Sequence, residues 1–293
     1  MPYLLFLFIC FCWGTSFILM DRAGEAFGPA AIGCGRMLGG ALTLAAYGLV
    51  SRRWIRLSHV DWLGLVFVAL LANAWPYIVQ PYVMQQAGEH GFFGMLVTLV
   101  PIATIFAAGV MLRQWPTHRQ WIGVIGGLLC AVLIVWDGSK RGMPPWLLAL
   151  AVSTPISYAI GNCFMKWRLA HLPTAQLTAL FMGIGAIAVA PFALTPLGEV
   201  FDLGAPASPR GWPVAVASMI ALGVGSTGVA ILAFVHLIQT QGPLFAGMVT
   251  YVVPLIALVW GQFDGERLTT LQLAAIGGVL AMVGLVQWGA RCV

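Results

Sequence analysis

Two short phrases place a threonine close to a proline inside otherwise apolar sequence, VTLVP at residues 97 to 101 and VTYVVP at residues 249 to 254. Proline has no amide hydrogen, so inside a helix it leaves the carbonyl four residues earlier without its donor. The carbonyls concerned are those of Val97 and Thr250. A freed carbonyl beside a hydroxyl can bind a polar group of a small ligand or let the helix bend. The predicted ligand contacts here are Thr98, Thr250 and Tyr251, and the predicted hinges are Pro101 and Pro254.

A second group of polar and aromatic residues lies in ANAWPYIVQPYVMQQ, residues 72 to 86. Spacings of four, three and four residues place four of its members on one helix face: Asn73, Tyr77, Gln80 and Met84. Pro76 and Pro81 should kink this helix. The face suits a ligand-binding wall, and the plainer alternative is hydrogen bonding between helices. We take Asn73, Tyr77 and Gln80 as ligand contacts and both prolines as hinges.

Aromatic and amide groups recur in two other apolar stretches. Thr154, Tyr158 and Asn162 follow one another at intervals of four, which places them on one helix face. Trp13 begins the phrase WGTSF, where its indole ring can either stack on the ring of a ligand or fill space between helices. Trp13, Tyr158 and Asn162 are therefore further predicted ligand contacts, with both roles of Trp13 left open.

Arg36 is the one arginine clearly inside an apolar stretch. It follows Pro29 by seven residues, which places it roughly 10 Å into its helix. An arginine at the centre of a membrane helix costs about 2.5 to 3.5 kcal/mol on insertion scales. Its guanidinium group can reach outward, bind neighbouring carbonyls, or receive a ligand carboxylate through its fork. We keep Arg36 as a candidate ligand contact. Because no acidic residue lies in the middle of an apolar stretch, a site for organic cations is disfavoured.

These residues belong to a chain whose composition requires a membrane. Of its 293 residues, 60% are apolar and only 8% are charged, whereas about a quarter of a soluble domain is charged. A spanning helix needs about 20 mostly apolar residues. Ten such stretches are predicted: 3 to 20, 30 to 50, 62 to 86, 91 to 112, 119 to 136, 145 to 164, 175 to 196, 212 to 239, 243 to 262 and 270 to 289. They do not alternate polar and apolar residues as strands of a membrane barrel would, so the predicted fold class is all-α.

The chain also reads as two copies of one unit. Pro101 and Pro254 are separated by 153 residues, the glycine pairs beginning at Gly126 and Gly277 by 151, and Trp136 and Trp288 by 152. We predict one five-helix repeat in residues 1–142 and another in 143–293. Because five is odd, the second copy must be inverted in the membrane. Inverted repeats are a common architecture of secondary transporters, in which the substrate binds near the midplane between the copies.

Loop charges predict the orientation. The loops on the side of both termini hold eight basic residues, and those on the other side hold five. Basic residues are enriched in cytoplasmic loops, so both termini are predicted to be cytoplasmic. The net charge of +5 is spread over short loops, which argues against a nucleic-acid partner.

Several phrases together resemble a known family. They are WGTSF at 13 to 17, Pro29 with Arg36 seven residues later, the threonine and proline of the fourth stretch, and GERLTTLQLAAIGGVLAMVGLV at 265 to 286. The chain resembles the EamA-type transporters of the drug/metabolite transporter superfamily over essentially its whole length. The resemblance implies a five-plus-five inverted arrangement and export of amino acids or other small metabolites from bacteria, as in aromatic amino acid exporters of the YddG type. The Gly-Glu-Arg turn at 265 to 267 has no counterpart in the first copy, where Leu112 to Trp115 stand.

The expected function is export of small neutral or zwitterionic metabolites, above all aromatic or bulky apolar amino acids, across the bacterial inner membrane by alternating access. A passive channel and an exporter of drugs or other metabolites are the alternatives. We expect no enzyme, because Ser226 and His236 lie about 15 Å apart along one helix and phosphate-loop and zinc motifs are absent. No metal and no cofactor are expected. The expected partners are a small-molecule substrate and lipid, and a monomer is expected to suffice.

Overall fold

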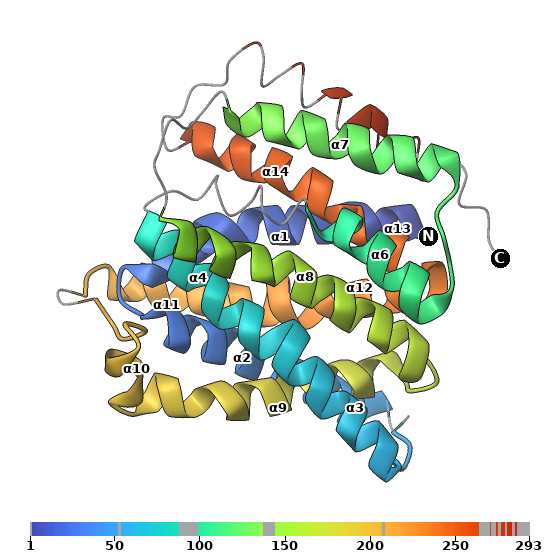
Figure 1. Ribbon diagram of the computed structural model, residues 1–293. Helices are drawn as coiled ribbons and strands as arrows, with labels where there is room; N and C mark the ends of the chain where they lie inside the picture. Colours follow the sequence, from blue (N-terminus) through green and yellow to red (C-terminus); the bar gives the residue numbers. More distant parts are fainter. Residues whose placement is uncertain are drawn as a thin grey trace.

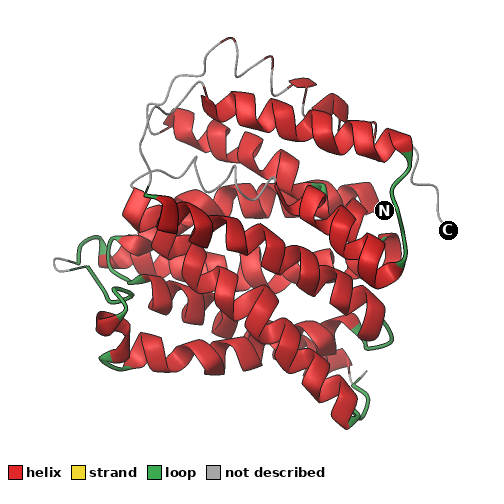
Figure 2. Ribbon diagram, in the orientation of Figure 1, coloured by secondary structure: helices red, strands yellow, loops and turns green. Residues whose placement is uncertain are grey.

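The computed structural model describes residues 2–51, 54–87, 99–136, 144–206 and 209–263, with scattered positions between 270 and 285. Every regular element in these ranges is a helix (Figure 2). The long elements of the first half are α1 (Pro2–Gly24), α2 (Pro29–Ser51), α3 (His59–Ala69), η1 (Leu70–Ala74), α4 (Trp75–Ala87), α6 (Val100–Leu112) and α7 (His118–Trp136). The second half contains α8 (Pro145–Arg168), α9 (Thr174–Leu194), α10 (Leu197–Val200), α11 (Trp212–Ala221), η3 (Leu222–Val229), α12 (Ala230–Gln241), α13 (Pro243–Gly247) and α14 (Val249–Phe263).

The described helices have the length and surface of a membrane protein. Five of them are long and apolar enough to span a bilayer: Pro2–Gly24, His59–Gln86, Pro145–Arg168, Thr174–Leu194 and Trp212–Gln241. Large apolar side chains point outward, among them Leu63 at 72%, Val110 at 76% and Leu194 at 81% exposure, as expected where lipid is the solvent. The predicted all-α class is confirmed. Ten spans stay a prediction, because most of the stretch 270 to 289 lies outside the described residues.

Two helices that each run through the molecule contain a π-helical segment. The first, η1, joins α3 to α4, and the second, η3, joins α11 to α12. Leu70 begins η1 and Leu222 begins η3, so the two segments are 152 residues apart, the separation that relates Trp136 to Trp288. In a π-turn each backbone hydrogen bond spans one residue more than in an α-helix. The helix is therefore wider there, and a carbonyl is displaced from the regular α-helical hydrogen-bond pattern. The sequence indicated a kink near Pro76 but no irregularity at residues 222 to 229.

The four predicted hinge prolines lie in different helical contexts. Pro76 is the second residue of α4, directly after η1, and Pro81 lies inside α4. Pro101 lies in the first turn of α6, where a missing amide removes no helical hydrogen bond. The carbonyl of Val97, predicted to be freed by Pro101, lies outside the described residues. Pro254 is inside α14 and does leave the carbonyl of Thr250 without an amide donor from its own helix.

The ninth predicted stretch is not one continuous helix. A short helix, α13, ends at Gly247, and α14 begins at Val249. The Thr250 hydroxyl donates to the carbonyl of Gly247 across this break, with 2.8 Å between the oxygens. The break therefore precedes the phrase VTYVVP and presents it at the start of a helix.

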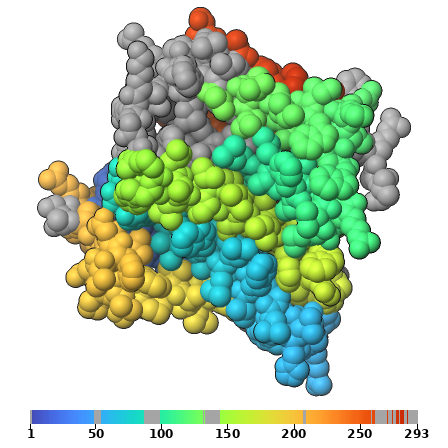
Figure 3. All heavy atoms as spheres, viewed as in Figure 1, coloured from blue at the N-terminus to red at the C-terminus, as the bar shows by residue number. Residues whose placement is uncertain are grey.

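Helices from the two halves of the chain are interleaved. In Figure 1, α1 lies beside α14 from the other half, and α8 lies beside α6 and α4. The helix α2 packs on α9 and η3, and Figure 3 shows α3, in blue, between α8 and α9. Glycines permit the closest of these approaches: a methyl group on Gly39 would lie 2.9 Å from the Cα of Gly223. Each half therefore buries its helices largely against the other.

Candidate functional site

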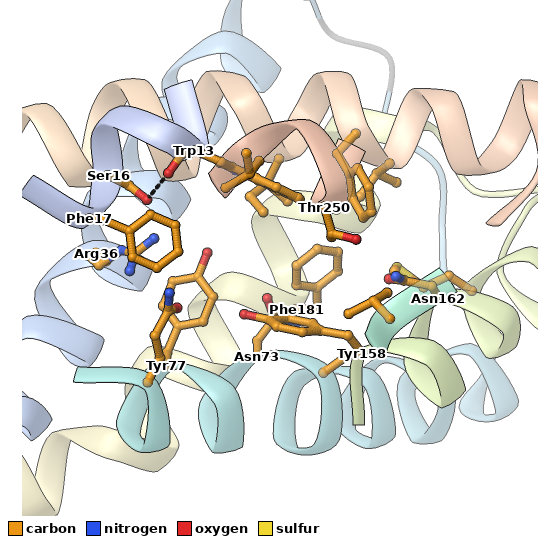
Figure 4. Close-up of a pocket in the computed structure, with 18 residues that line it drawn as sticks. Trp13, Ser16, Phe17, Arg36, Asn73, Tyr77, Tyr158, Asn162, Phe181 and Thr250 are labelled. Atoms are coloured by element: carbon orange, nitrogen blue, oxygen red, sulfur yellow. Dashed lines mark hydrogen bonds between the residues drawn. The ribbon is translucent and has the colours of Figure 1, made fainter. Parts of the chain in front are cut away.

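A central cavity lies between the interleaved halves (Figure 4). The space free of atoms within its lining, including open solvent at its mouth, is about 750 Å³. Eight of the ten predicted ligand contacts line it: Trp13, Arg36, Asn73, Tyr77, Gln80, Tyr158, Asn162 and Thr250. They come from α1, α2, η1, α4, α8 and α14, so folding brings together residues that are distant in the chain.

The other two predicted contacts are not part of this wall. Thr98 lies outside the described residues. Tyr251 is 1% exposed and points away from the cavity lining, since its hydroxyl donates to the carbonyl of Val124 in α7 at 2.7 Å. Its ring also occupies the space beside Gly127. On the helix, Tyr251 follows the cavity-lining Thr250 by one position, about 100° around the axis, so the two residues face different neighbours.

Aromatic side chains that sequence reasoning missed complete the cavity. Phe17, Phe181 and Phe234 all line it, and they come from α1, α9 and α12. Nothing in the sequence distinguishes these rings from phenylalanines that face lipid, because both kinds lie in continuously apolar helices. Only the packing of the helices decides which rings face inward. The participation of α9, through Phe181, was likewise not predicted.

Arg36 lies in the cavity wall and does not reach the surface, since only 4% of it is exposed. Its Nε donates to the hydroxyl of Thr227 in η3 at 3.3 Å, and its Nη1 lies 2.8 Å from the sulfur of Met20. The guanidinium carbon is 4.6 Å from the ring centre of Tyr77, an attractive arrangement of a cation over an aromatic face. The predicted alternative of an outward-reaching arginine therefore does not hold.

The indole of Trp13 is held in one orientation. Its Nε1 donates to the carbonyl of Ser226 in η3 at 3.1 Å, and its ring packs on Phe234 with 4.7 Å between ring centres. The hydroxyl of Ser226 donates in return to the carbonyl of Cys12 at 2.9 Å. Trp13 thus both fills space between α1 and α12 and presents ring surface to the cavity.

The polar side chains at other points of the wall lie on different helices and are almost fully buried. Asn73 lies within η1 and is 4% exposed, and its Nδ2 donates to the carbonyl of Val68 at 3.3 Å. Asn162 is 3% exposed and lies about one turn beyond Tyr158 on α8. Thr154, the third member of that stripe, is buried and is not among the lining residues. The wall therefore combines amides with rings rather than forming one continuous polar stripe.

The chemistry of the cavity is that of binding. Its described lining includes one cation, Arg36, and no acidic side chain. Across the part of the chain that the structure describes, no group of three or more His, Cys, Asp or Glu side chains could hold a metal. Ser226 is bonded to a backbone carbonyl, and His236, ten positions along, faces outward. A site of this kind can hold an apolar or aromatic molecule with a few polar groups.

An all-helical molecule with lipid-facing apolar surfaces and an aromatic-lined cavity between two interleaved halves defines a class, the membrane transporters. The chain belongs to the EamA-like transporter family, whose profile matches residues 1–136 and again residues 145–287. The double match agrees with the two copies predicted from the repeated phrases.

Relatives that this chain covers over most of their length carry transporter names. The chain is 25% identical over 285 residues to the "uncharacterized inner membrane transporter YedA" of Escherichia coli (strain K12), covering 94% of this chain and 87% of that one. It is 23% identical to an "uncharacterized transporter" of Archaeoglobus fulgidus, with 93% of each chain covered. A solved crystal structure superposes with a TM-score of 0.79 over 98% of both chains at 16% identity, which shows a shared fold.

Proposed function

We propose that this protein is a secondary transporter that exports small neutral or zwitterionic metabolites, above all amino acids with aromatic or bulky apolar side chains, across the bacterial inner membrane by alternating access. The observation that carries the proposal is the cavity between the halves, walled by rings and amides and without an acidic side chain among its described residues. The inner membrane is the location that the name of the Escherichia coli relative suggests.

In the proposed mechanism, rearrangement of the two copies closes the cavity first toward one side of the membrane and then toward the other. We take residues 1–142 and 143–293 as inverted five-helix repeats with both termini in the cytoplasm. The paired π-segments and the α13–α14 break support this mechanism, because irregular turns let a helix bend where it lines a cavity. A substrate bound near the midplane would then be exposed to one side at a time, and a monomer would contain the whole pathway.

Counterflow in proteoliposomes tests this function. Purified protein is reconstituted with a high internal concentration of unlabelled L-phenylalanine, and uptake of labelled L-phenylalanine is measured. A carrier changes between its two conformations faster with substrate bound than without. Internal substrate should therefore accelerate uptake several-fold over uptake into empty vesicles. Uptake that is unaffected by internal substrate would identify a passive channel. Absence of exchange for a panel of apolar amino acids would contradict the proposed substrate class.

A further inference from the structure

Arg36 is a buried cation whose partners among the described residues are all uncharged. Its described contacts are a hydroxyl, Thr227, a thioether, Met20, and an aromatic ring, Tyr77. A thioether sulfur is only a weak hydrogen-bond acceptor. The described residues provide no hydrogen-bond partner for the second terminal nitrogen, Nη2, and the side chain forms part of the cavity wall. The guanidinium group therefore retains donors that a molecule in the cavity can reach.

The described lining of the cavity offers this cation no counter-charge. No aspartate or glutamate is among its described lining residues, which apart from Arg36 are aromatic, aliphatic, thioether, hydroxyl and amide side chains. A buried charge is costly unless an opposite charge compensates it, and the usual partner of a guanidinium fork is a carboxylate. A guanidinium group at the membrane–water interface would be solvated by water and would need no ligand. Arg36 is not in that position, because only 4% of it is exposed.

We propose that Arg36 binds the carboxylate of the transported molecule, so that the substrates are apolar or aromatic monocarboxylates, amino acids included. The inference rests on the proposed transport function and changes its substrate class, because a carboxylate becomes the required group and monoanions join the zwitterionic amino acids. Figure 4 shows Arg36 and Tyr77 at one end of the cavity and Tyr158, Phe181 and Asn162 toward the other. A carboxylate at Arg36 places the apolar end of the molecule among these rings. An ammonium group has no acidic partner there, so it is tolerated rather than required.

Four compounds that share a phenylethyl core separate these contributions. They are 3-phenylpropionate, L-phenylalanine, 2-phenylethylamine and 3-phenylpropionamide. Ligand-dependent melting temperatures of the purified full-length protein give the affinity of each. Both carboxylates should bind at least about tenfold more tightly than the amine and the amide, the effect of one charge-assisted hydrogen-bonded pair. Equal or tighter binding of the amine overturns the proposal, and so does binding of none of the four at millimolar concentration.

Substitutions test whether Arg36 causes the preference for carboxylate ligands. Arg36→Gln should make 3-phenylpropionate and 3-phenylpropionamide bind within about twofold of each other, because the amide ligand never used the charge. Arg168→Gln is the matched control: this arginine stacks on Trp167 at 4.2 Å, is not among the lining residues, and should leave the preference intact. Retention of the preference in Arg36→Gln contradicts the proposal. If that variant does not fold, Arg36→Lys, which keeps the charge without the fork, should bind 3-phenylpropionate at least severalfold more weakly than the wild type and 3-phenylpropionamide within about twofold of it. Unchanged affinity of Arg36→Lys for 3-phenylpropionate contradicts the proposal.

Transport of the same compounds separates this inference from the proposed function. Exchange of the amine, with no exchange of either carboxylate, would overturn the assignment of Arg36 and leave a transporter. Tight binding of the carboxylates with no exchange of any compound would support the site and contradict the transport function.

Discussion

At the residue scale, the cavity wall is made of side chains whose orientations are set before a ligand arrives. Trp13 is held by Ser226 and Phe234, and Asn73 is held by a carbonyl of its own helix. Thr250 is tied to Gly247 across the α13–α14 break. Polar groups fixed in this way lose little conformational freedom when they bind, which favours selective recognition.

Tyr158→Ala tests the ring surface of the cavity. Removing a ring that lines the site should weaken binding of L-phenylalanine roughly tenfold, because both buried area and ring contacts are lost. Tyr47→Ala, which removes a tyrosine that is 55% exposed on α2, is the control and should bind as the wild type does. Titration of the melting temperature measures both. Normal binding by Tyr158→Ala and by Asn73→Ala, at normal expression, would refute the assignment of this cavity.

Tyr251→Phe tests a residue predicted to contact the ligand but located elsewhere. Losing the hydroxyl leaves the carbonyl of Val124 without this buried partner, so the free energy of unfolding should fall by about 1 kcal/mol. The affinity for L-phenylalanine should not change, because Tyr251 is not in the wall. Thermal denaturation with and without ligand measures both quantities. A weaker affinity with unchanged stability would restore Tyr251 to the binding site.

At the scale of elements, the two π-segments are points where the halves are joined. The carbonyl of Leu71, in η1, accepts a hydrogen bond from the hydroxyl of Ser157 in α8. The carbonyl of Ser226, in η3, accepts one from Trp13 in α1. In both cases the first long helix of one half donates to the π-segment of the other. In both π-segments, a backbone carbonyl therefore binds a side chain of a partner helix from the other half.

Gly39→Ala tests the close packing of α2 on η3. The added methyl group would meet the backbone of Gly223 at 2.9 Å, so the helices must separate, with an expected loss of about 1 to 3 kcal/mol of stability. The control is Gly225→Ala on η3, where a methyl group would have no heavy atom of the described chain within 4 Å. That variant should be as stable as the wild type or slightly more stable, because alanine favours helices. Equal melting temperatures for both variants would show that the approach at Gly39 is not tight.

At the scale of the whole molecule, neither half has a core of its own in the described residues. The helices α1 and α2 bury themselves against α14, α9 and η3, and α8 packs on α6 and α4. Such interleaving is compatible with two copies of opposite orientation, since equivalent helices then meet across a common axis. Because the cavity lies between the halves, a motion of one half relative to the other must change the shape of the cavity.

Reporter fusions test the opposite orientation of the copies. Green fluorescent protein placed after residue 293 should fluoresce, and alkaline phosphatase placed after residue 140, between the copies, should be active, because these points are predicted to lie on opposite sides of the membrane. Exchanging the two reporters should abolish both signals. Fluorescence from green fluorescent protein fused after residue 140 as well as after residue 293 would rule out an odd number of membrane spans between these two points.

Periodicity and composition were sufficient to predict much of this molecule, because a bilayer restricts a chain to helices of a set length and makes polar residues within them conspicuous. For this reason eight of the ten residues predicted as ligand contacts, including Asn73 and Tyr158, lie in the cavity lining. Phe17, Phe181 and Phe234 were missed, because an apolar ring does not stand out from the other residues of an apolar helix. The π-segment at residues 222 to 229 was also missed, because it contains no proline.

The sequence by itself determined an all-helical membrane chain, its two copies and its family, since these depend on hydropathy and repetition along the chain. The tertiary structure decided which side of each helix faces inward. It sent Tyr251 to Val124 and its neighbour Thr250 to the cavity, and it enclosed Arg36 without an acidic partner among the described residues. Such choices follow from contacts between helices that are more than a hundred residues apart, and no local pattern records them.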